Sequence, residues 1–388
     1  MTTDPAAACL ADAPWLLELT EALVRVESPT DDPAAVNRAV DLAADRLRAI
    51  GGRPRRIAAE DAGDHLRVEF GQGRRQILLL GHLDTVWPVG QLGRMPCRRE
   101  GDRLHGPGVF DMKAGVAIAA LATRALFAAS PPAGCRVVML WTADEETGSA
   151  TSRALLEAEA RASDAVLVFE PSLPGGALKT SRKGCGQYEL VVTGVAAHAG
   201  VDPGKGVSAI REIARQIVAV EALHDLDRGV SVNVGLIRGG SRANVVAPEA
   251  RAVIDVRVPT AADAARVDAA LRALRPVLPG ATLEVRGGID RPPLERSAGV
   301  VRLLELAREV GAGLGQTVDE GGTGGGSDGN FCAALGVPTL DGLGAVGDGA
   351  HAVHEHVVIP SLAPRAALVA GMLVRLTSED GWGRTARS

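Results

Sequence analysis

The polar residues best suited to chemistry stand next to apolar runs of the sequence. His82 and Asp84 follow the run Leu-Leu-Leu-Gly, and Glu170 follows Val-Leu-Val-Phe. Asp111 stands just before an alanine-rich run, and three consecutive acids occupy 144–146. This pattern is typical of buried strands that end in polar side chains. In open α/β sheets, ligands bind at the carboxyl ends of such strands.

His82 and Asp84 are one residue apart. Alternation along an extended segment places their side chains on the same side, with Leu83 opposite. A carboxylate beside an imidazole fixes the tautomer of the ring, so that the other ring nitrogen can bind a metal. Taken alone, however, the pair is more typical of a strand end with two solvated polar residues than of a metal site.

Each of the other polar segments also has a structural explanation. Asp111 could cap a helix, and the acids at 144–146 could begin one, where they favour the helix dipole. His351, near the end of the chain, could be an ordinary surface histidine. Glu170 is harder to explain in this way, because a carboxylate after four apolar residues needs a partner or a cation.

Considered together, these segments favour a metal site. They follow or adjoin predicted parallel strands, so one edge of the sheet would collect His, Asp, Glu, Glu and His. So many carboxylates cannot all be ionised at neutral pH without cations. Nitrogen and oxygen ligands without cysteine suit Zn, Co or Mn better than Ca. The number of ligands fits two metals that share one carboxylate, which is a co-catalytic pair.

The elements that would position these residues alternate between strands and helices. Strands are expected over 65–70, 76–80, 135–142 and 165–169, and helices over 15–26, 33–50, 113–129 and 149–160. Asp31 or Asp32 could cap the helix that starts at Pro33. Alternation of this kind requires crossover connections and therefore predicts a largely parallel sheet.

The pattern changes near Ser181. Strands are then expected over 188–193, 231–236, 250–258 and 281–285, with helices over 206–222 and 261–274. This β-α-β-β-α-β order fits a small ferredoxin-like α+β unit. Helices and strands alternate again from Ser297 to a last helix over 361–376. The predicted domains are 1–182, 183–296 and 297–388, and the first and last of them form one α/β unit that the second interrupts.

Composition and charge exclude several classes of function. The 388 residues carry a net charge of −5, which gives no reason to expect nucleic acid or an anionic membrane as partner. Aromatic residues are only 3%, so the cores must consist mainly of aliphatic side chains. No apolar run is expected to span a membrane, and residues 1–14 lack the features of a secretory signal. Five scattered cysteines without a C-x-x-C pair are typical of a cytoplasmic protein with reduced thiols.

Several segments together resemble a known enzyme family. The segments are His82-Leu83-Asp84-Thr85-Val86, Gly108 to Gly115, Asp144 to Ser149, Phe169-Glu170-Pro171, and Gly349-Ala350-His351 with Glu355. As an ordered set they resemble the aminoacylase/carboxypeptidase family of two-zinc hydrolases. That family includes acetylornithine deacetylase, succinyl-diaminopimelate desuccinylase and the folate-cleaving glutamate carboxypeptidases. The resemblance extends over nearly the whole chain and is strongest to the glutamate carboxypeptidase branch.

The resemblance implies five metal ligands, which are His82, Asp111, Glu146, Glu170 and His351. One zinc would be held by His82 and Glu170. The other would be held by Glu146 and His351, and Asp111 would bridge the two. Two divalent metal ions are therefore the implied cofactors, most simply zinc, with cobalt or manganese as substitutes that these ligands would accept.

Two further residues beside the metals would assist the reaction. Asp84 would orient His82. Glu145 would be the general base, which takes a proton from the bridging water and passes it to the leaving amine. In the family, the peptide bond that follows the bridging Asp is cis, which here is the bond after Asp111. His354 could compete as a metal ligand with the histidine three residues before it.

The inserted segment also matches the family. Thr193 to Gly200 resembles a lid segment, and its His198 would donate to the substrate carbonyl oxygen in the site of the neighbouring subunit. Asn244 matches a residue that binds the carboxylate end of the substrate, and Arg257 would pair with that carboxylate as a bidentate fork. Gly326 would let the backbone approach the substrate. The resemblance therefore implies a homodimer that forms through the inserted domain.

The reaction implied is hydrolysis of an amide bond with release of a C-terminal amino acid, glutamate or a similar acidic residue by the nearest branch. The substrate would be a small peptide or an N-acyl amino acid, and an N-acyl amino acid deacylase of the same mechanism is the alternative. A serine hydrolase is a further alternative, because Gly325-Gly326-Ser327-Asp328-Gly329 satisfies G-x-S-x-G, although a poor strand precedes it. A non-catalytic protein of this fold would be expected to have lost a ligand or Glu145, and here each is present.

Overall fold

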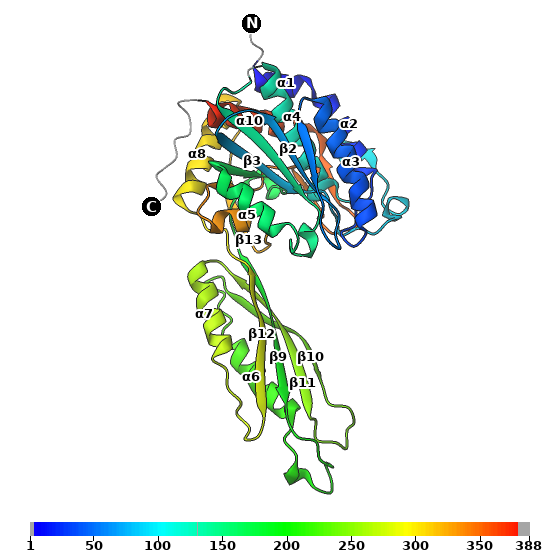
Figure 1. Ribbon diagram of the computed structural model, residues 1–388, viewed down its shortest axis with the longest axis vertical. Helices are drawn as coiled ribbons and strands as arrows, with labels where there is room; N and C mark the ends of the chain where they lie inside the picture. The colour runs from blue at the N-terminus through cyan, green and yellow to red at the C-terminus, as the bar shows by residue number, and fades with distance from the viewer. Residues whose placement is uncertain (1–3, 130, 379–388) are drawn as a thin grey trace. The chain divides into compact units, whose positions relative to one another are not determined.

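The computed structural model describes residues 4–129 and 131–378, which divide into two compact units. Unit 1 consists of three stretches, which are the described residues up to Thr180, Arg296–Gly322, and the described residues from Ser327 onward. Unit 2 consists of Ser181–Glu295 and the short segment Thr323–Gly326 (Figure 1). The sequence pattern assigns that short segment to the larger domain. The predicted ranges also include residues 1–3, 130 and 379–388, which lie outside the described part of the chain.

The core of unit 1 is a six-stranded sheet with the order β1-β2-β6-β3-β7-β14. Its strands are β1 (Arg53–Ile57), β2 (His65–Gly71), β6 (Cys135–Thr142), β3 (Arg75–His82), β7 (Ala165–Val168) and β14 (Thr339–Leu340). The neighbours from β6 to β14 pair in parallel, whereas β2 is antiparallel to both β1 and β6. The sheet is therefore mixed, and the parallel arrangement expected from the sequence holds for the strands that carry the polar ends.

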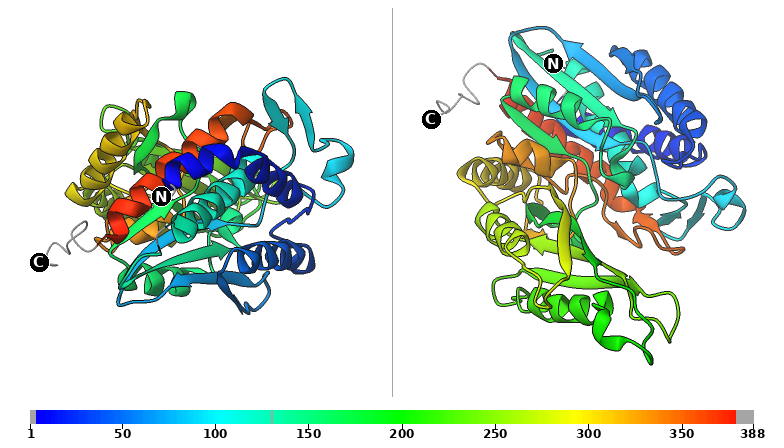
Figure 2. Two further views of the ribbon diagram at one scale, coloured as in Figure 1. Left: turned by 90° about the horizontal axis from the view of Figure 1, so that it is seen from above. Right: turned by 60° about the horizontal axis from the view of Figure 1, so that its bottom comes forward.

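Helices pack against this sheet and against one another (Figures 1 and 2). They are α1 (Pro5–Ala11), α2 (Ala13–Val24), α3 (Pro33–Ala49), α4 (Ala114–Ala129), α5 (Arg153–Ala162), α8 (Ala298–Gly313), α9 (Gly329–Ala334) and α10 (Ile359–Thr377). Leu156 of α5 and Phe331 of α9 share a core with Leu78 and Leu80 of β3. α4 and α10 also contact β3 and contact α1 and α2. The start of α3 is as predicted, because the Asp32 carboxylate accepts a hydrogen bond from the backbone N–H of residue 35 at 2.9 Å.

Two stretches of unit 1 are long and apolar enough to cross a membrane by length and composition alone. They are Val109–Ala129, which includes α4, and Ile359–Thr377, which is α10. The expectation that no run would reach this length therefore needs correction. The buried share is 78% in the most apolar window of the first stretch and 61% in that of the second, which is typical of core helices.

Two smaller sheets bring distant segments together. One has the order β15-β16-β5-β4, formed by β15 (Gly347–Asp348), β16 (His356–Val358), β5 (Arg103–His105) and β4 (Arg98–Glu100). The other pairs β8 (Leu178–Arg182) with β13 (Glu320–Thr323). Because β15 and β16 flank residues 349–355, the first of these sheets fixes the hairpin that carries His351.

Unit 2 has the element order β-α-β-β-α-β that the sequence predicts. Its elements are β9 (Gly184–Thr193), α6 (Ala209–Glu221), β10 (Ser231–Gly239), β11 (Glu249–Val258), α7 (Ala261–Arg272) and β12 (Thr282–Arg291). The strands form one antiparallel sheet with the order β10-β11-β9-β12. Ile213 of α6 and Val267 of α7 share a core with alternate residues of the strands, so both helices cover one face of this sheet. Ser208 and Thr260 begin the two helices, because each side chain accepts a backbone N–H of the first turn.

Candidate metal centre

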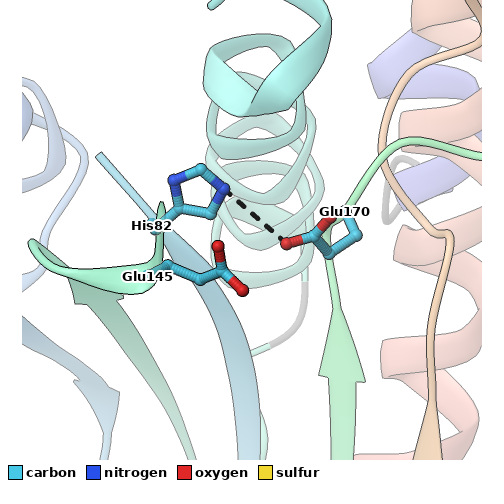
Figure 3. Close-up of side chains that lie close together, drawn as sticks. All are labelled: His82, Glu145 and Glu170. Carbon is cyan, nitrogen blue, oxygen red and sulfur yellow. Dashed lines mark ion pairs between the residues drawn. The ribbon is translucent and has the colours of Figure 1, made fainter. Parts of the chain in front are cut away.

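Three neighbouring strands in unit 1 end at the same edge of the sheet. β3 lies between β6 and β7, and in the parallel register the end of β3 at His82 lies level with the end of β6 at Thr142. The acids at 144–146 follow β6, and Glu170 follows β7. Figure 3 shows the side chains of Glu145 and Glu170 close to the ring of His82. The polar strand ends that the sequence singles out are therefore brought together.

The ring of His82 is buried, with only 1% exposed, and its two nitrogens have different partners. Nδ1 lies 2.9 Å from the backbone oxygen of Asp84 and 3.5 Å from Oδ1 of the same residue. Donation from Nδ1 to the backbone oxygen leaves the lone pair of Nε2 available to a metal. Nε2 lies 3.2 Å from Oδ1 of Asp111. It also lies 3.6 Å from Oε1 of Glu170, the pair that the dashed line marks in Figure 3.

The carboxylate of Asp84 has a second task. It accepts a hydrogen bond from the Thr30 hydroxyl at 2.7 Å, and from the backbone N–H groups of Glu145 at 3.4 Å and Glu146 at 3.2 Å. The ring of His82 is therefore closer to the backbone oxygen of Asp84 than to its carboxylate, which binds the backbone of the acidic turn instead. Sequence reasoning missed Thr30, because the two side chains are 54 residues apart and no local pattern marks the contact.

His351 forms a second group with two of the predicted ligands. Its Nε2 lies 3.1 Å from Oε2 of Glu146 and 3.4 Å from Oδ2 of Asp111. Asp111 thus directs Oδ1 toward His82 and Oδ2 toward His351, which is the arrangement that a bridging carboxylate needs. The peptide bond between Asp111 and Met112 is cis, as the resemblance implies.

The carboxylates raise the pKa values of both histidines. Burial lowers the pKa of His82, but Asp111 and Asp84 outweigh this effect and raise it well above its usual range. Asp111 and Glu146 raise the pKa of His351 to about 10. Burial would raise the pKa of Asp111, yet His351 and His82 hold it well below its usual range. A field that retains protons on imidazole rings also attracts metal cations, which compete with those protons for the same nitrogens.

The donor set fits divalent metal ions. Oε1 of Glu146 is buried and has no hydrogen-bond partner among the described residues, and a bound cation would remove the cost of burying it. Two groups of side chains have ligand atoms that all lie within 4.8 Å of one another, and they are His82 with Glu145 and Glu170, and His82 with Asp111 and Glu146. Neither group contains His354, whose backbone oxygen instead lies 3.0 Å from Nδ1 of His356.

Two glycines make room for the end of β7. A Cβ added at Gly115 would lie 2.1 Å from the backbone oxygen of Phe169. A Cβ added at Gly344 would lie 2.2 Å from the same oxygen and 2.6 Å from the backbone oxygen of Glu170. Because the obstructing atoms belong to the backbone, no side-chain rotation could relieve these contacts. The position of Glu170 therefore depends on glycine on both sides of it.

Buried polar groups also hold the acidic turn, residues 144–146, in place through hydrogen bonds. Ser149 has a φ of 63°, which is uncommon for a residue with a side chain, and its hydroxyl donates a hydrogen bond to the buried carboxylate of Asp328. Thr142 donates to the same carboxylate at 2.9 Å. The carboxylate of Asp144 accepts from the backbone N–H and the hydroxyl of Thr151, at 2.7 and 2.8 Å. Sequence reasoning noticed Asp328 only as part of G-x-S-x-G and missed this contact.

The serine of the G-x-S-x-G motif, Ser327, makes hydrogen bonds that support the fold. Ser327 is fully buried, and its hydroxyl donates to Oδ2 of Asp341 at 2.7 Å. Its backbone N–H binds the side-chain oxygen of Asn330 at 3.0 Å. Among the described residues, no histidine is hydrogen-bonded to Ser327. The arrangement lacks the adjacent base that a nucleophilic serine needs, so it argues against the serine hydrolase alternative.

His198 and Asn244 lie together at one end of unit 2. Residues 198 and 245 form a bridge, and the backbone N–H of Ala199 donates to the backbone oxygen of Asn244 at 2.9 Å. Both side chains are exposed. Nδ1 of His198 accepts hydrogen bonds from the backbone N–H groups of Gly200 and Val201, each at 3.1 Å. A neutral His198 must therefore carry its proton on Nε2, which makes that nitrogen a hydrogen-bond donor.

Arg257 lies toward the opposite end of the unit-2 sheet. It pairs with Cys185 near the start of β9, whereas Ala250 at the other end of β11 pairs with Val192. Seven residues at a rise of about 3.3 Å each separate the two positions by about 23 Å. Within one chain, Asn244 and Arg257 therefore cannot bind the same small carboxylate, although the resemblance links both to it.

The guanidinium of Arg257 already has partners in its own unit. Nε lies 2.9 Å from Oδ1 of Asp255, and Nη2 lies 2.8 Å from Oδ2 of the same side chain. Gly326 lies at this end of the sheet, because a Cβ added there would be 3.3 Å from Sγ of Cys185 and 2.6 Å from Cδ of Arg291. Arg257 and Gly326 are thus neighbours of Cys185, and His198 and Asn244 form a separate group.

Comparison with known proteins places this geometry in context. Residues 78–375 match the model of "Peptidase family M20/M25/M40". Carboxypeptidase G2 of Pseudomonas sp. (strain RS-16) is 31% identical over 376 residues, which cover 94% of this chain and 89% of that protein. Succinyl-diaminopimelate desuccinylase of Xanthomonas oryzae pv. oryzae (strain MAFF 311018) is 31% identical over 386 residues, which cover 94% of this chain and 99% of that protein.

Solved structures share the fold. Aminopeptidase PepT from Bacillus cereus has a TM-score of 0.75 at 22% identity, and the match covers 93% of this chain and 97% of that one. The M20 family metallo-carboxypeptidase Sso-CP2 from Sulfolobus solfataricus has a TM-score of 0.69 at 16% identity, with 93% and 98% covered. A dinuclear metal-binding M20 peptidase from Bacillus subtilis has a TM-score of 0.63 at 15% identity, with 94% and 98% covered.

Replacing Ser327 with alanine separates metal-assisted from serine-dependent hydrolysis. The variant S327A is expected to hydrolyse a panel of N-acyl amino acids as the wild type does. Its free energy of unfolding should fall by about 1–3 kcal/mol, because the buried Asp341 carboxylate loses a donor. Release of ninhydrin-positive product and urea unfolding measure the two effects.

As a control, a chelator should abolish wild-type activity and added zinc should restore it. An inactive S327A, together with wild-type activity that survives removal of metal, would show that the serine carries the reaction.

Proposed function

The chain belongs to peptidase family M20/M25/M40, and from this premise we propose that it is a carboxypeptidase that releases a C-terminal amino acid from an amide substrate. Apart from the specific reaction, the chain is a metal-dependent hydrolase of this family. The observation that carries the proposal is the position of the Asp111 carboxylate between His82 and His351, with Glu145 beside them. The resemblance to the glutamate carboxypeptidase branch favours glutamate or a similar acidic residue as the amino acid released.

A deacylase that acts on N-acyl amino acids is the second candidate. Carboxypeptidase G2 and succinyl-diaminopimelate desuccinylase are each 31% identical to this chain, and both matches extend over 94% of it. The two reactions share bond type and mechanism, since each hydrolyses an amide next to an amino acid. Product release from N-acyl amino acids and from dipeptides with C-terminal glutamate would distinguish them.

The five predicted ligands would hold two divalent cations, zinc in our proposal. His82 and Glu170 would bind one ion and Glu146 and His351 the other, with Asp111 shared. Such a pair of bound ions supplies a water of lowered pKa and polarises the amide carbonyl. Cobalt and manganese would accept the same nitrogen and oxygen ligands.

Glu145 is our candidate for the general base. It shares the 3₁₀ turn η3 (Glu145–Thr147) with Glu146, and three residues per turn point consecutive side chains about 120° apart. One of the two acids can therefore serve as a metal ligand while the other moves a proton. The carboxylate of Glu145 comes close to His82 and Glu170, as Figure 3 shows. From there it would take a proton from the attacking water and pass it to the leaving amine.

Arg257 is our candidate for binding the α-carboxylate of the amino acid that is released. A guanidinium matches a carboxylate with two parallel hydrogen bonds. Its present bonds to Asp255 mean that a substrate carboxylate would have to share the guanidinium or displace that side chain. Gly326, close to Cys185 at the same end of unit 2, would let the backbone approach the substrate.

We further propose a homodimer in which His198 and Asn244 act in the site of the partner subunit. Both residues are exposed, and Ala250, at their end of the sheet, lies about 23 Å, or seven strand residues, from Arg257. β10 is an edge strand of the described sheet, and its Leu236 and Ile237 are 59% and 56% exposed. An exposed apolar edge of this kind is suited to pairing with the same strand of a second copy.

The setting that we propose is the cytoplasm, with a small peptide or N-acyl amino acid as substrate and neither nucleic acid nor membrane as partner. All five cysteines are free thiols. The net charge of −5 offers no general attraction for phosphate groups.

Replacing Glu145 with glutamine tests the general base. The variant E145Q should retain two bound metals, while kcat falls by about 10²–10⁴-fold because the amide cannot accept the proton. Metal content and turnover are measured on the same preparation. The adjacent E146Q is the matched control, because it makes the same change on the same turn but should lose bound metal. Full turnover in E145Q would contradict the assignment.

Mixing two inactive variants tests the exchange of residues between subunits. H198A and E145Q should each be inactive as homodimers, because each lacks one part of every site. Subunits that exchange in a mixture should form hybrid dimers with one site intact, so activity should reappear. The recovery is followed with time after mixing, against each variant alone. No recovery from a mixture shown to contain hybrid dimers, or full activity from a monomer, would refute a role for His198 in the partner's site.

A further inference from the structure

Glu355 is a buried acid to which the proposed reaction assigns no task. Its side chain is fully buried, yet four N–H groups point at the carboxylate. Oε1 accepts hydrogen bonds from the backbone N–H groups of Phe110 at 2.9 Å and Asp111 at 3.1 Å. Oε2 accepts from the backbone N–H of Gly108 at 2.9 Å and from the indole N–H of Trp87 at 2.8 Å.

The three backbone bonds join two segments that are far apart in the sequence. Glu355 stands four residues after His351, in the turn between β15 and β16. Its three backbone partners lie in the irregular helix η2 (Val109–Lys113), which carries Asp111, and directly before it, whereas Trp87 lies in the loop after β3. Glycine at 349 allows the turn to close, since a Cβ there would lie 2.9 Å from the backbone nitrogen of Glu355. Glu355 therefore fastens the hairpin of one proposed metal ligand to the backbone of the other.

The contacts require a carboxylate. All four partners are donors, and a carboxylate offers about four acceptor positions and no proton. A glutamine of the same shape would offer one oxygen, and its NH₂ group would face N–H groups that can only donate. The buried ammonium of Lys113 lies in the same region and interacts electrostatically with Glu355. Burial raises the pKa of Glu355 to about 7, and the four donors oppose this rise because each of them favours the charged carboxylate.

We propose that Glu355 is a positioning residue of the metal centre, which holds residues 108–111 so that the two carboxylate oxygens of Asp111 face His82 and His351. The inference rests on the proposed metal site. In this view Glu355, which lies in the same hairpin as His351, fixes the position of Asp111, the ligand that the two proposed metals share. Loss of this support should weaken metal binding as well as the fold, because a displaced Asp111 can no longer serve both groups.

If Glu355 only stabilised the fold, its replacement would have a different effect on zinc binding. Any buried, hydrogen-bonded acid stabilises the folded chain, so a fall in Tm alone decides nothing. Metal that binds only the folded state raises Tm by an amount that depends on its affinity. The informative quantity is therefore the increase in Tm that zinc produces. A structural residue lowers Tm with and without zinc equally, whereas a positioning residue also reduces the increase.

Glu212 provides a matched control in unit 2. It is fully buried, and its carboxylate accepts hydrogen bonds from the backbone N–H groups of Val277 at 2.9 Å and Leu278 at 2.7 Å, and from the side chain of Gln216 at 2.6 Å. The change Glu212→Gln therefore produces the same chemical mismatch with backbone donors. None of these partners belongs to the proposed metal ligands.

The experiment compares the wild type with E355Q and E212Q. Each full-length protein is stripped of metal, its Tm is measured with and without Zn²⁺, and its zinc affinity is measured by competition with a chelating dye. Both variants should lower the Tm of the stripped protein. Only E355Q should reduce the increase in Tm and weaken zinc binding, by about 10–100-fold as is typical when a group behind a metal ligand is lost.

Three results would overturn the proposal. One is an unchanged zinc affinity in folded E355Q, and another is an equal loss of affinity in E212Q. If E355Q does not fold, Glu355→Asp takes its place, because it keeps the charge but is one methylene too short to reach all four donors. Unchanged zinc affinity in E355D would be the third. None of these results bears on the proposed reaction, which is tested separately by chelation and by the E145Q variant.

Discussion

The concentration of negative charge at one edge of a buried sheet is the constraint on which the rest of unit 1 depends. Asp111 lies between His82 and His351, with Glu145, Glu146 and Glu170 close by. Carboxylates brought so close repel one another and favour whatever cation can enter among them. The same negative field raises the pKa values of both histidines. A hydrolase that needs bound cations at neutral pH makes use of this repulsion, and the protein must hold the acids together against it.

The backbone and the buried polar groups supply that restraint. Gly115 and Gly344 leave space for the strand end that carries Glu170. Asp84 holds the turn of Glu145 and Glu146 from one side, and Asp328 holds it through Ser149 from the other. Glu355 gathers the backbone N–H groups around Asp111. The turn of Glu145 and Glu146 and the backbone of Asp111 thus rest on second groups that are themselves buried and hydrogen-bonded, which is how an arrangement of like charges keeps its geometry.

The features that could be predicted from the sequence are those that a local pattern determines. Features that depend on contacts between distant residues could not be predicted. The polar ends of β3, β6 and β7, the cap at Asp32 and the element order of unit 2 follow from periodicity and capping. The reversed direction of β2 does not, because strand alternation alone does not fix direction. Thr30 and Asp328 act across 54 residues or more, so no spacing reveals them. Ser327 satisfies a catalytic motif, yet burial beside Asp341 gives it a structural place. The separation of Asn244 from Arg257 becomes visible only when the strand register of unit 2 is known.

The separation within unit 2 gives the proposed dimer its physical reason, since no single chain can bring both ends of that sheet to one small substrate. The two bound metals are tested most directly by anomalous diffraction from a crystal of the zinc-loaded protein. Two zinc peaks are expected, one beside His82 and Glu170 and one beside Glu146 and His351, with the carboxylate of Asp111 between them. A single peak, or zinc bound away from Asp111, would contradict this arrangement.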